Sequence, residues 1–435
     1  MTRRITTFLA ITMMSLIATG SYAAEKIEPS ERATAEARSH SWTSWRGPMR
    51  DGISGETGLQ SQWPEGGPKL IWQVNGLGNG FSSVAISNGR IISMGKIDGS
   101  VSVIALNQKD GSKLWQTPIS DGNNPNCTPT IDGDRVYALT HNGNLACLDV
   151  KTGEILWKKS FTADFGGRME SGWGYSESPL VDGDRIVCTP GGRENMVVAL
   201  NKETGEKLWS TAMPAEAGSR GQDGAAYSSV VIGNGGGVRQ YVQLTGRGVF
   251  GIDSKSGKVL WQYNRIANGT ANIPTPIVKG DYVFCSTGYN TGAALLKLNK
   301  TGAGIAAQEV YFLEPRDVQN HHGGMILLGD HIYMGHGHNQ GFPLCIEMMT
   351  GKVKWRPGRG VGQRSAAIIY ADGHLYFRYE SGDMALIEAT PDSYKVKGQF
   401  RLNSVNGASW PHPVIAGKKL YLRDQNNLMC YDIAK

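Results

Sequence analysis

The chain has 435 residues, of which 44 are Lys or Arg and 38 are Asp or Glu, giving a formal net charge of +6 at pH 7. This small positive balance comes without a basic run or an alternation of basic and aromatic residues, so it does not indicate nucleic-acid binding. Beyond its N-terminal segment the sequence has no stretch of about 20 apolar residues, which disfavours a membrane-spanning helix. We therefore expect a soluble protein, and we expect it to be a monomer.

The first residues are typical of an export signal. Arg3 and Arg4 precede a short uncharged apolar stretch, and Ser21-Tyr22-Ala23 then gives a small-x-small cleavage pattern. Residues 1–23 are therefore predicted to be a signal peptide, and the polar, charged residues 24–41 a flexible leader. The protein is expected in the periplasm or outside the cell.

From Trp42 onward one pattern recurs, and it predicts a β-hairpin. The pattern begins with a small residue, an apolar residue and Asp, Asn or Glu. Gly follows, and then an apolar residue and Trp. A turn with Gly at positive φ therefore joins two short strands. Intact copies end at Trp115, Trp157, Trp209, Trp261 and Trp355. A second turn, such as residues 132–135, precedes each copy, so that each unit has four strands. Spacings of 43, 42 and 52 residues between successive tryptophans from Trp72 suit a propeller blade.

Counting the units predicts the architecture. Seven are complete, and the chain ends on Cys430-Tyr431-Asp432, the front half of an eighth, whose back half is Lys69–Trp72. The sequence therefore predicts an all-β fold, an eight-bladed β-propeller of four-stranded antiparallel blades spanning residues 42–435. The ring is closed by pairing the N- and C-terminal strands, which leaves no blade incomplete. Each Trp is expected to cover the gap to the neighbouring blade.

The hairpin pattern is similar to that of the PQQ-like (quinoprotein alcohol dehydrogenase-like) repeat superfamily. Longer segments resemble an exported bacterial subgroup labelled polyvinyl-alcohol-dehydrogenase-like: WRGP at 45–48, GWGYSESP at 172–179, NHHGG at 320–324 and SWPHP at 409–413. The resemblance implies pyrroloquinoline quinone and a divalent metal ion as cofactors and an alcohol or a sugar as substrate. The sequence departs from the true quinoprotein dehydrogenases in having no adjacent cysteine pair, and only Glu177 has a counterpart among their calcium ligands.

The six cysteines follow the repeat rather than a disulfide pattern. Cys147, Cys345 and Cys430 stand where other units have a small residue such as Ala105. Cys188 and Cys285 share a second small position, and Cys127 begins an inner strand. We expect all six to be buried and reduced.

The position of a residue in the repeat predicts whether it lies at the channel. In a propeller the loop leading into each inner strand and the loop between the second and third strands open on one face, around a channel that small polar residues here predict to be solvated. Histidine is the usual proton shuttle and transition-metal ligand near neutral pH, and six of the nine histidines lie within residues 321–374. The predicted catalytic residues are His322, His338, Glu177, Tyr175 and Arg364. The predicted cofactor contacts are Trp173, Tyr227, Trp410 and His412, and the predicted metal ligands are His321 and His336.

These residues lead to one geometric prediction and three hypotheses of function. His322, His336 and His338 should converge with Glu177 and His412 at the channel mouth; the alternative is that the histidines only satisfy loop backbone groups. The first hypothesis is a quinoprotein-like oxidoreductase acting on alcohols or sugars. The second is a non-catalytic propeller that binds a protein partner or a glycan, and the third is a polysaccharide lyase with a His/Tyr/Arg site.

Overall fold

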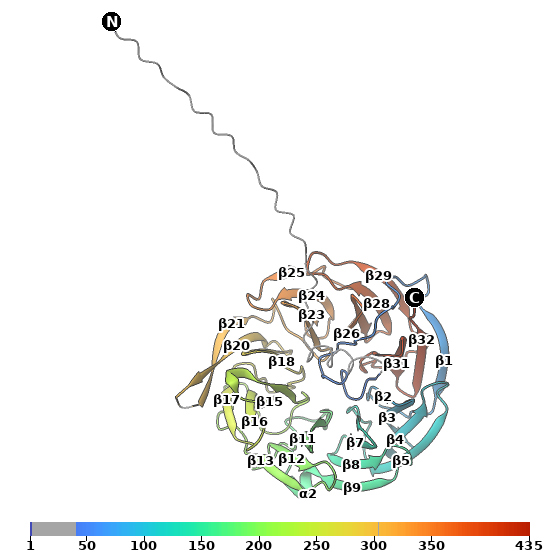
Figure 1. The fold of residues 1–435 in the computed structure, drawn as a ribbon, viewed down its shortest axis with the longest axis horizontal. Helices are drawn as coiled ribbons and strands as arrows, with labels where there is room; N and C mark the ends of the chain where they lie inside the picture. The colour runs from blue at the N-terminus through green and yellow to red at the C-terminus, as the bar shows by residue number, and fades with distance from the viewer. Residues whose placement is uncertain (2–40, 303) are drawn as a thin grey trace.

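The computed structural model describes residues 1, 41–302 and 304–435 and has eight four-stranded antiparallel sheets arranged as the blades of a propeller (Figure 1). The predicted signal peptide and nearly all of the predicted leader lie outside the described residues. Short strands line the axis: β2 (Ala85–Ser87), β6 (Thr130–Asp132), β10 (Leu180–Asp182), β14 (Val231–Gly233), β18 (Ile277–Lys279), β22 (Met325–Leu328), β26 (Ala366–Ala371) and β30 (Val414–Ala416). The second strands are β3 (Arg90–Ile97), β7 (Arg135–Leu139), β11 (Arg185–Cys188), β15 (Gln240–Thr245), β19 (Tyr282–Thr287), β23 (His331–His336), β27 (His374–Tyr379) and β31 (Lys419–Asp424).

The third and fourth strands complete each blade toward the rim. The third strands are β4 (Ser100–Asn107), β8 (Asn144–Asp149), β12 (Val197–Asn201), β16 (Gly248–Asp253), β20 (Gly292–Thr301), β24 (Phe342–Glu347), β28 (Asp383–Glu388) and β32 (Asn427–Asp432). The outer strands are β5 (Lys113–Asp121), β9 (Ile155–Ser160), β13 (Lys207–Thr211), β17 (Val259–Tyr263), β21 (Gly304–Leu313), β25 (Val353–Trp355), β29 (Val396–Arg401) and β1 (Lys69–Asn75). Among the described residues, helices are confined to α2 (Phe161–Phe165) and the 3-10 turn η1 (Gly235–Gly237), and no helix is long and apolar enough to cross a membrane.

The ring closes as the sequence predicted. β1 pairs with β32, with Leu70 opposite Tyr431 and Trp72 opposite Cys430, so that the two ends of the chain share one blade (Figure 1). The hairpin turns have the expected chemistry, for example Asn88 and Gly89 between β2 and β3, both with positive φ (48° and 74°).

The repeat tryptophans join neighbouring blades. The indole N–H of Trp115 donates to Val150 O at 3.1 Å, and that of Trp157 donates to Lys202 O at the same distance. In the blades that carry the tryptophan, the small residue lies directly opposite it, as Cys147 does for Trp157, because a larger side chain there would occupy the space of the indole. All six cysteines are free and buried.

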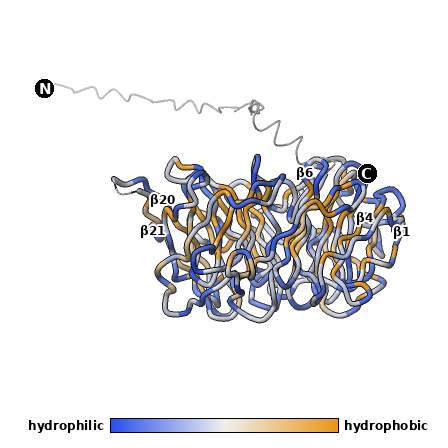
Figure 2. Tube along the Cα trace, turned by 90° about the horizontal axis from the view of Figure 1, so that it is seen from below, coloured by the Kyte–Doolittle hydropathy of each residue, from blue (hydrophilic) through white to orange (hydrophobic). Residues whose placement is uncertain are grey.

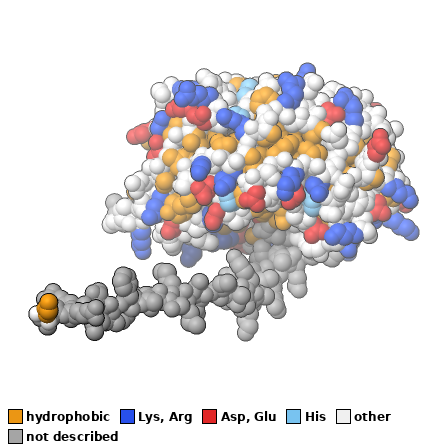
Figure 3. All heavy atoms as spheres, turned by 90° about the horizontal axis from the view of Figure 1, so that it is seen from above, with side chains coloured by type: hydrophobic (Ala, Val, Ile, Leu, Met, Phe, Trp, Pro, Cys, Tyr) orange, Lys and Arg blue, Asp and Glu red, His pale blue; other side chains and the backbone are white. Residues whose placement is uncertain are grey.

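Every blade carries a register shift where its outer strand pairs with the third strand, for example between Ala105 and Leu106. Such bulges twist an edge strand and so discourage pairing with another chain. Hydrophobic segments run through the thickness of the disc (Figure 2), where the apolar faces of adjacent blades pack together. Figure 3 shows charges of both signs mixed around an apolar band on the side of the disc.

The central channel, predicted to be solvated, is closed on one side by residues 42–54, which we call the plug (Figure 1). Its backbone is hydrogen-bonded to two inner strands. Trp42 N donates to Ile86 O of β2, and Ser54 N donates to Tyr370 O of β26, both near the hairpin turns that end these strands. Two buried guanidinium groups of the plug also hold it to the blades through hydrogen bonds to backbone carbonyl groups. Arg46 donates to Met325 O, and Arg50 donates to Ser178 O at 2.7 Å.

Candidate functional site

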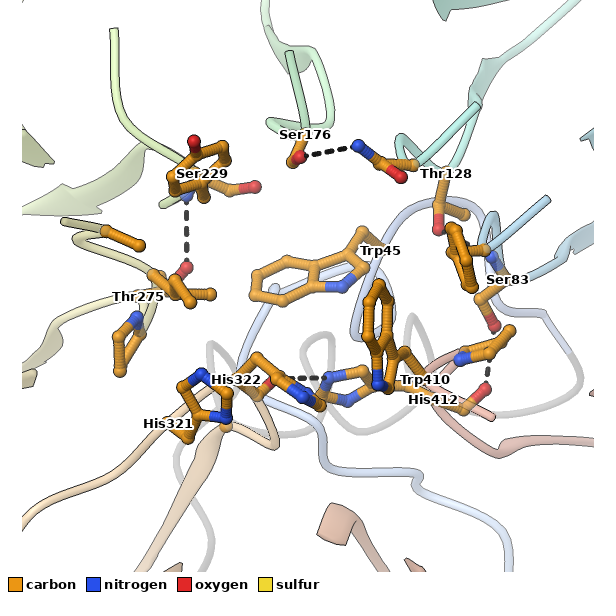
Figure 4. A pocket seen from close by; sticks show the side chains of 18 of the residues that line it. Trp45, Ser83, Thr128, Ser176, Ser229, Thr275, His321, His322, Trp410 and His412 are labelled. Atoms are coloured by element: carbon orange, nitrogen blue, oxygen red, sulfur yellow. Dashed lines mark hydrogen bonds between the residues drawn. The ribbon is translucent and has the colours of Figure 1, made fainter. Parts of the chain in front are cut away.

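A cavity of about 190 Å³ lies above the plug, at the mouth of the channel (Figure 4). Its walls are the loops that lead into the inner strands, and Trp45 of the plug lies across its centre. The loops of the ring therefore form the walls of the cavity, and the plug forms its floor. The cavity is closed at the end of the channel where the plug lies. The lining side chains are mainly aromatic or hydroxyl-bearing: Trp45, Phe81, Trp173, Tyr227, Tyr289 and Trp410, with Ser83, Thr128, Ser176, Ser229 and Thr275.

Trp410 is the centre of the aromatic cluster. Its ring centroid lies 4.4 Å from that of Phe81, 5.8 Å from that of Trp173 and 5.4 Å from that of His322. Trp173 is 58% exposed, which is unusual for so large an apolar side chain and leaves its ring available at the mouth. The cluster therefore offers aromatic surface from three separate loops.

Three histidines add neutral polar groups to the pocket. Ser365 Oγ donates to Asn339 Oδ1 (3.0 Å), so it must accept a hydrogen bond from His321 Nδ1 (2.8 Å). His321 Nε2 then accepts from the Tyr289 hydroxyl at 3.2 Å. His412 Nε2 donates to His322 O at 3.4 Å, which leaves His412 Nδ1 as an acceptor.

Burial keeps these imidazoles uncharged. Desolvation lowers the pKa of His322 and of His412 to about 3, with neighbouring histidines contributing for His322 and Arg46 for His412. Burial also lowers the pKa of His321 far below its usual value. His322 Nε2, His412 Nδ1 and Trp410 Nε1 are buried without a hydrogen-bond partner among the described residues. Unpaired buried polar atoms are costly, so they indicate a place for a ligand or for water.

The family model described as outer membrane protein assembly factor BamB, built on PQQ-like repeats, matches residues 69–171 and 98–357, more than half of the chain. The chain belongs to this family of PQQ-like β-propellers. BamB of Salmonella typhimurium is 32% identical over 140 residues, 30% of this chain and 31% of that protein. BamB of Kangiella koreensis is 23% identical over 219 residues, 48% of each. The chain thus spans less than half the length of these curated relatives.

Solved structures share the fold with this PQQ-like propeller. BamB from Moraxella catarrhalis superposes with a TM-score of 0.57 at 14% identity, covering 83% of this chain and 97% of that one. Quinohemoprotein alcohol dehydrogenase from Comamonas testosteroni gives a TM-score of 0.60 at 12% identity, covering 94% and 83%. At such identities the similarity shows the fold alone, so the chemistry has to be argued from the pocket.

The quinone cofactor of the dehydrogenase-like propellers does not match this pocket. Pyrroloquinoline quinone carries three carboxylates and is expected together with a divalent metal ion, a combination that requires cationic side chains and oxygen ligands. Within the part of the chain that the structure describes, no Lys, Arg, Asp or Glu lines the cavity. No three His, Cys, Asp or Glu side chains in that part are grouped to hold a metal ion either. The donor set is neutral throughout.

The structure brings together six of the eleven residues predicted for the site. Its pocket is lined by His321, His322, Trp173, Tyr227, Trp410 and His412. His338 lies directly behind this wall, with its ring 4.3 Å from that of His321 and its Nδ1 accepting from the Tyr289 backbone N–H at 3.2 Å. His338 therefore supports Tyr289 and His321.

The other four predicted residues point elsewhere, so the convergence of His322, His336, His338, Glu177 and His412 is only partial. His336 Nδ1 accepts from the Gln319 backbone N–H, and the Tyr175 hydroxyl donates to Pro190 O. Arg364 is exposed and pairs with Glu380 at 3.2 Å. Glu177 is only 2% exposed because it turns inward from the pocket wall, where it accepts from the Thr189 backbone N–H at 2.6 Å.

Glu177 instead lies in the electrostatic neighbourhood of Arg50 in the plug. Desolvation raises its pKa to about 7, and the nearby Arg50 acts in the opposite direction. The charge of Arg50 is buried as well, and burial lowers its pKa to about 10. The two groups therefore partly compensate each other beneath the pocket.

Trp45 and Tyr289 were missed as site residues when the sequence was read alone. Trp45 belongs to the WRGP segment at 45–48, which on sequence grounds carried only the resemblance to the exported subgroup. Tyr289 has φ = 54°, in the left-handed region that bulky residues seldom adopt. The repeat pattern places it in a loop between second and third strands on the channel face, but it was not among the predicted site residues.

A short loop across the pocket mouth carries Trp173, and Glu170 holds it in place. The Glu170 carboxylate accepts from Asn272 N at 2.8 Å and from Asn272 Nδ2 at 3.0 Å. The Ser171 hydroxyl, next in the chain, donates to Thr270 O at 2.7 Å and so must accept from the Tyr227 hydroxyl. We call residues 168–174 the strap.

Proposed function

We propose that this chain is an exported, non-catalytic propeller that binds a neutral glycan in the pocket above the plug. The observation that carries the proposal is the lining itself: six aromatic side chains and three buried unpaired polar atoms, with no charged side chain among the described lining residues. Export is supported by the N-terminal signal pattern, which is typical of proteins of the periplasm or the cell exterior.

A sugar ring matches this lining in both of its aspects. The C–H face of a pyranose is apolar and packs on an aromatic ring, and Trp410, Trp173 and Phe81 offer such surfaces. Its hydroxyl groups both donate and accept hydrogen bonds. They can therefore accept from Trp410 Nε1 and donate to His412 Nδ1, atoms that otherwise lack partners.

Titration with a panel of neutral oligosaccharides, followed by calorimetry and by tryptophan fluorescence, tests this proposal. Trp410→Ala should lower the affinity at least about tenfold, since both a stacking surface and a hydrogen-bond donor are lost. Trp410→Phe keeps the ring and loses the N–H, so its effect should be smaller. Trp72→Phe on the outer strand β1 serves as the matched control and should bind like the unaltered protein.

The same titration with pyrroloquinoline quinone and Ca²⁺ separates the proposal from the oxidoreductase hypothesis. We expect no saturable binding, because the carboxylates would enter a neutral, partly desolvated pocket without a cation. Tight quinone binding that Trp410→Ala abolishes, together with no binding of any sugar, would overturn the glycan proposal in favour of a quinoprotein.

A further inference from the structure

A second cavity opens on the same face of the propeller. It has a volume of about 480 Å³ and lies between the blade of β14–β17 and that of β18–β21; we call it the groove. Its walls are Arg220, Asn264, Arg265, Asn290, Thr291 and Phe312, among others. The loops before β14 and before β18 contribute to both cavities, so pocket and groove open toward the same side.

Two consecutive residues of one turn belong one to each cavity. Tyr289 lines the pocket and Asn290 lines the groove. Both have left-handed backbone conformations, with φ of 54° and 58°, which costs energy for non-glycine residues. Arg220 holds this ridge from the groove side by donating to Tyr289 O at 3.1 Å and to Asn290 O at 3.0 Å. This turn is therefore one fixed part of the boundary between the cavities.

The groove has the chemistry of a polar subsite. Thr291 is 4% exposed, and its hydroxyl is buried without a partner among the described residues. Asn264 presents an amide, and Phe312 presents an aromatic ring that the Arg265 guanidinium covers at 3.8 Å. Arg265 in turn is neutralised by Glu309 at 2.9 Å. The groove therefore offers hydrogen-bond donors and acceptors, with the charge of Arg265 paired and the Arg220 guanidinium turned to the carbonyl groups of Tyr289 and Asn290.

We propose that the groove is an outer subsite for the same glycan, so that the protein binds an oligosaccharide lying across the Tyr289–Asn290 ridge rather than a single sugar. This inference rests on the proposed function of the pocket. A linear chain whose first unit stacks on Trp410 would pass over Tyr289 and place later units beside Thr291 and Asn264. A monosaccharide would fill the pocket alone.

The experiment compares affinity for one neutral oligosaccharide series, from the monosaccharide to the hexasaccharide, in the unaltered protein and in Thr291→Val. Affinity should rise as units are added beyond the disaccharide. Thr291→Val, which is nearly isosteric, should lower affinity about fivefold for the longer members only, because one buried hydrogen bond is lost. Thr301→Val, at the exposed end of β20, is the matched control and should change no affinity. Asn264→Ala is the second test variant if the valine substitution unfolds the protein.

The outcomes distinguish the two proposals. Equal affinity for short and long members, unaffected by Thr291→Val and Asn264→Ala, would overturn the outer subsite and leave glycan binding in the pocket intact. A loss of affinity for the monosaccharide as large as that for the hexasaccharide would also overturn it, since the groove would then act only through the pocket. Failure of every member to bind would overturn the proposed function itself.

Discussion

The pocket histidines share one electrostatic situation, which is burial without a carboxylate partner. His322 and His412 have pKa values of about 3 in the folded protein, against about 6.5 in an unfolded chain. Below pH 6.5 the unfolded chain takes up protons that the folded protein does not. These residues therefore contribute stability that is lost as the pH falls from about 6.5 toward 4.

Two buried carboxyl groups have the opposite effect on how the free energy of unfolding depends on pH. The pKa values of Glu170 and Glu177 are raised by burial to about 7. The stability that each contributes is fully present below the unfolded value and is lost as the pH rises through 7. Between about pH 4.5 and 6.5 the two carboxyl groups offset two of the three pocket histidines, so the free energy of unfolding is expected to rise with pH up to about 6.5 and to fall from there to about 7.

A single substitution isolates the histidine contribution. His412→Gln should flatten the acid limb of the stability profile by about one proton, or about 1.4 kcal/mol per pH unit, because one group no longer titrates on unfolding. Urea unfolding between pH 4.5 and 8 measures this slope, with His374→Gln at the half-exposed start of β27 as the control. Parallel profiles for His412→Gln and the unaltered protein would contradict the burial argument.

At the scale of single elements, the strap is positioned by its buried carboxylate. Glu170→Gln places an amide N–H₂ where the carboxylate now accepts from Asn272, so the two donors face each other. Residues 168–174 should then exchange their amide hydrogens about tenfold faster, while the melting temperature changes little, since a loop opening is a local event. Hydrogen exchange with mass spectrometry measures this.

Exposed Glu194→Gln is the control for the strap, because it changes the same charge without touching the loop. Unchanged exchange of residues 168–174 in Glu170→Gln would show that Ser171 and the surrounding loop hold the strap unaided. A fall in melting temperature with faster exchange everywhere would show a general structural role instead.

At the scale of the whole molecule, the closure of the ring decides stability. Deleting residues 427–435 removes β32, the strand that pairs with both β1 and β31. The deletion therefore leaves β1 and β31 unpaired on that side and exposes two sheet edges. The melting temperature should fall by about 10 °C or more, because every blade packs on its neighbours around the ring. Deleting only residues 434–435 keeps β32 and should cost much less. An unchanged melting temperature after the longer deletion would contradict this account of closure.

The architecture could be predicted from sequence because each blade is specified locally. The turn residues, the small residue opposite each Trp and the alternating strands all act within about 45 residues, and their repetition gives the number of blades. Even the shared blade followed from two half-patterns, at Lys69–Trp72 and at Cys430–Asp432. The same reasoning located the loops of the pocket, and it identified Trp173, Trp410 and His322 among its lining.

Only the tertiary structure decided what closes the channel and which side chains enter it. The plug is an irregular segment whose partners, Ile86, Ser178, Met325 and Tyr370, are spread over the whole chain, so no local pattern could reveal it. Glu177, a candidate base in the sequence, is buried near Arg50 of the plug instead of lining the pocket. The repeats determine strands and blades because the residues that interact within a blade lie close together in the sequence. The pocket depends on long-range contacts between loops and plug, which only the closed ring brings together.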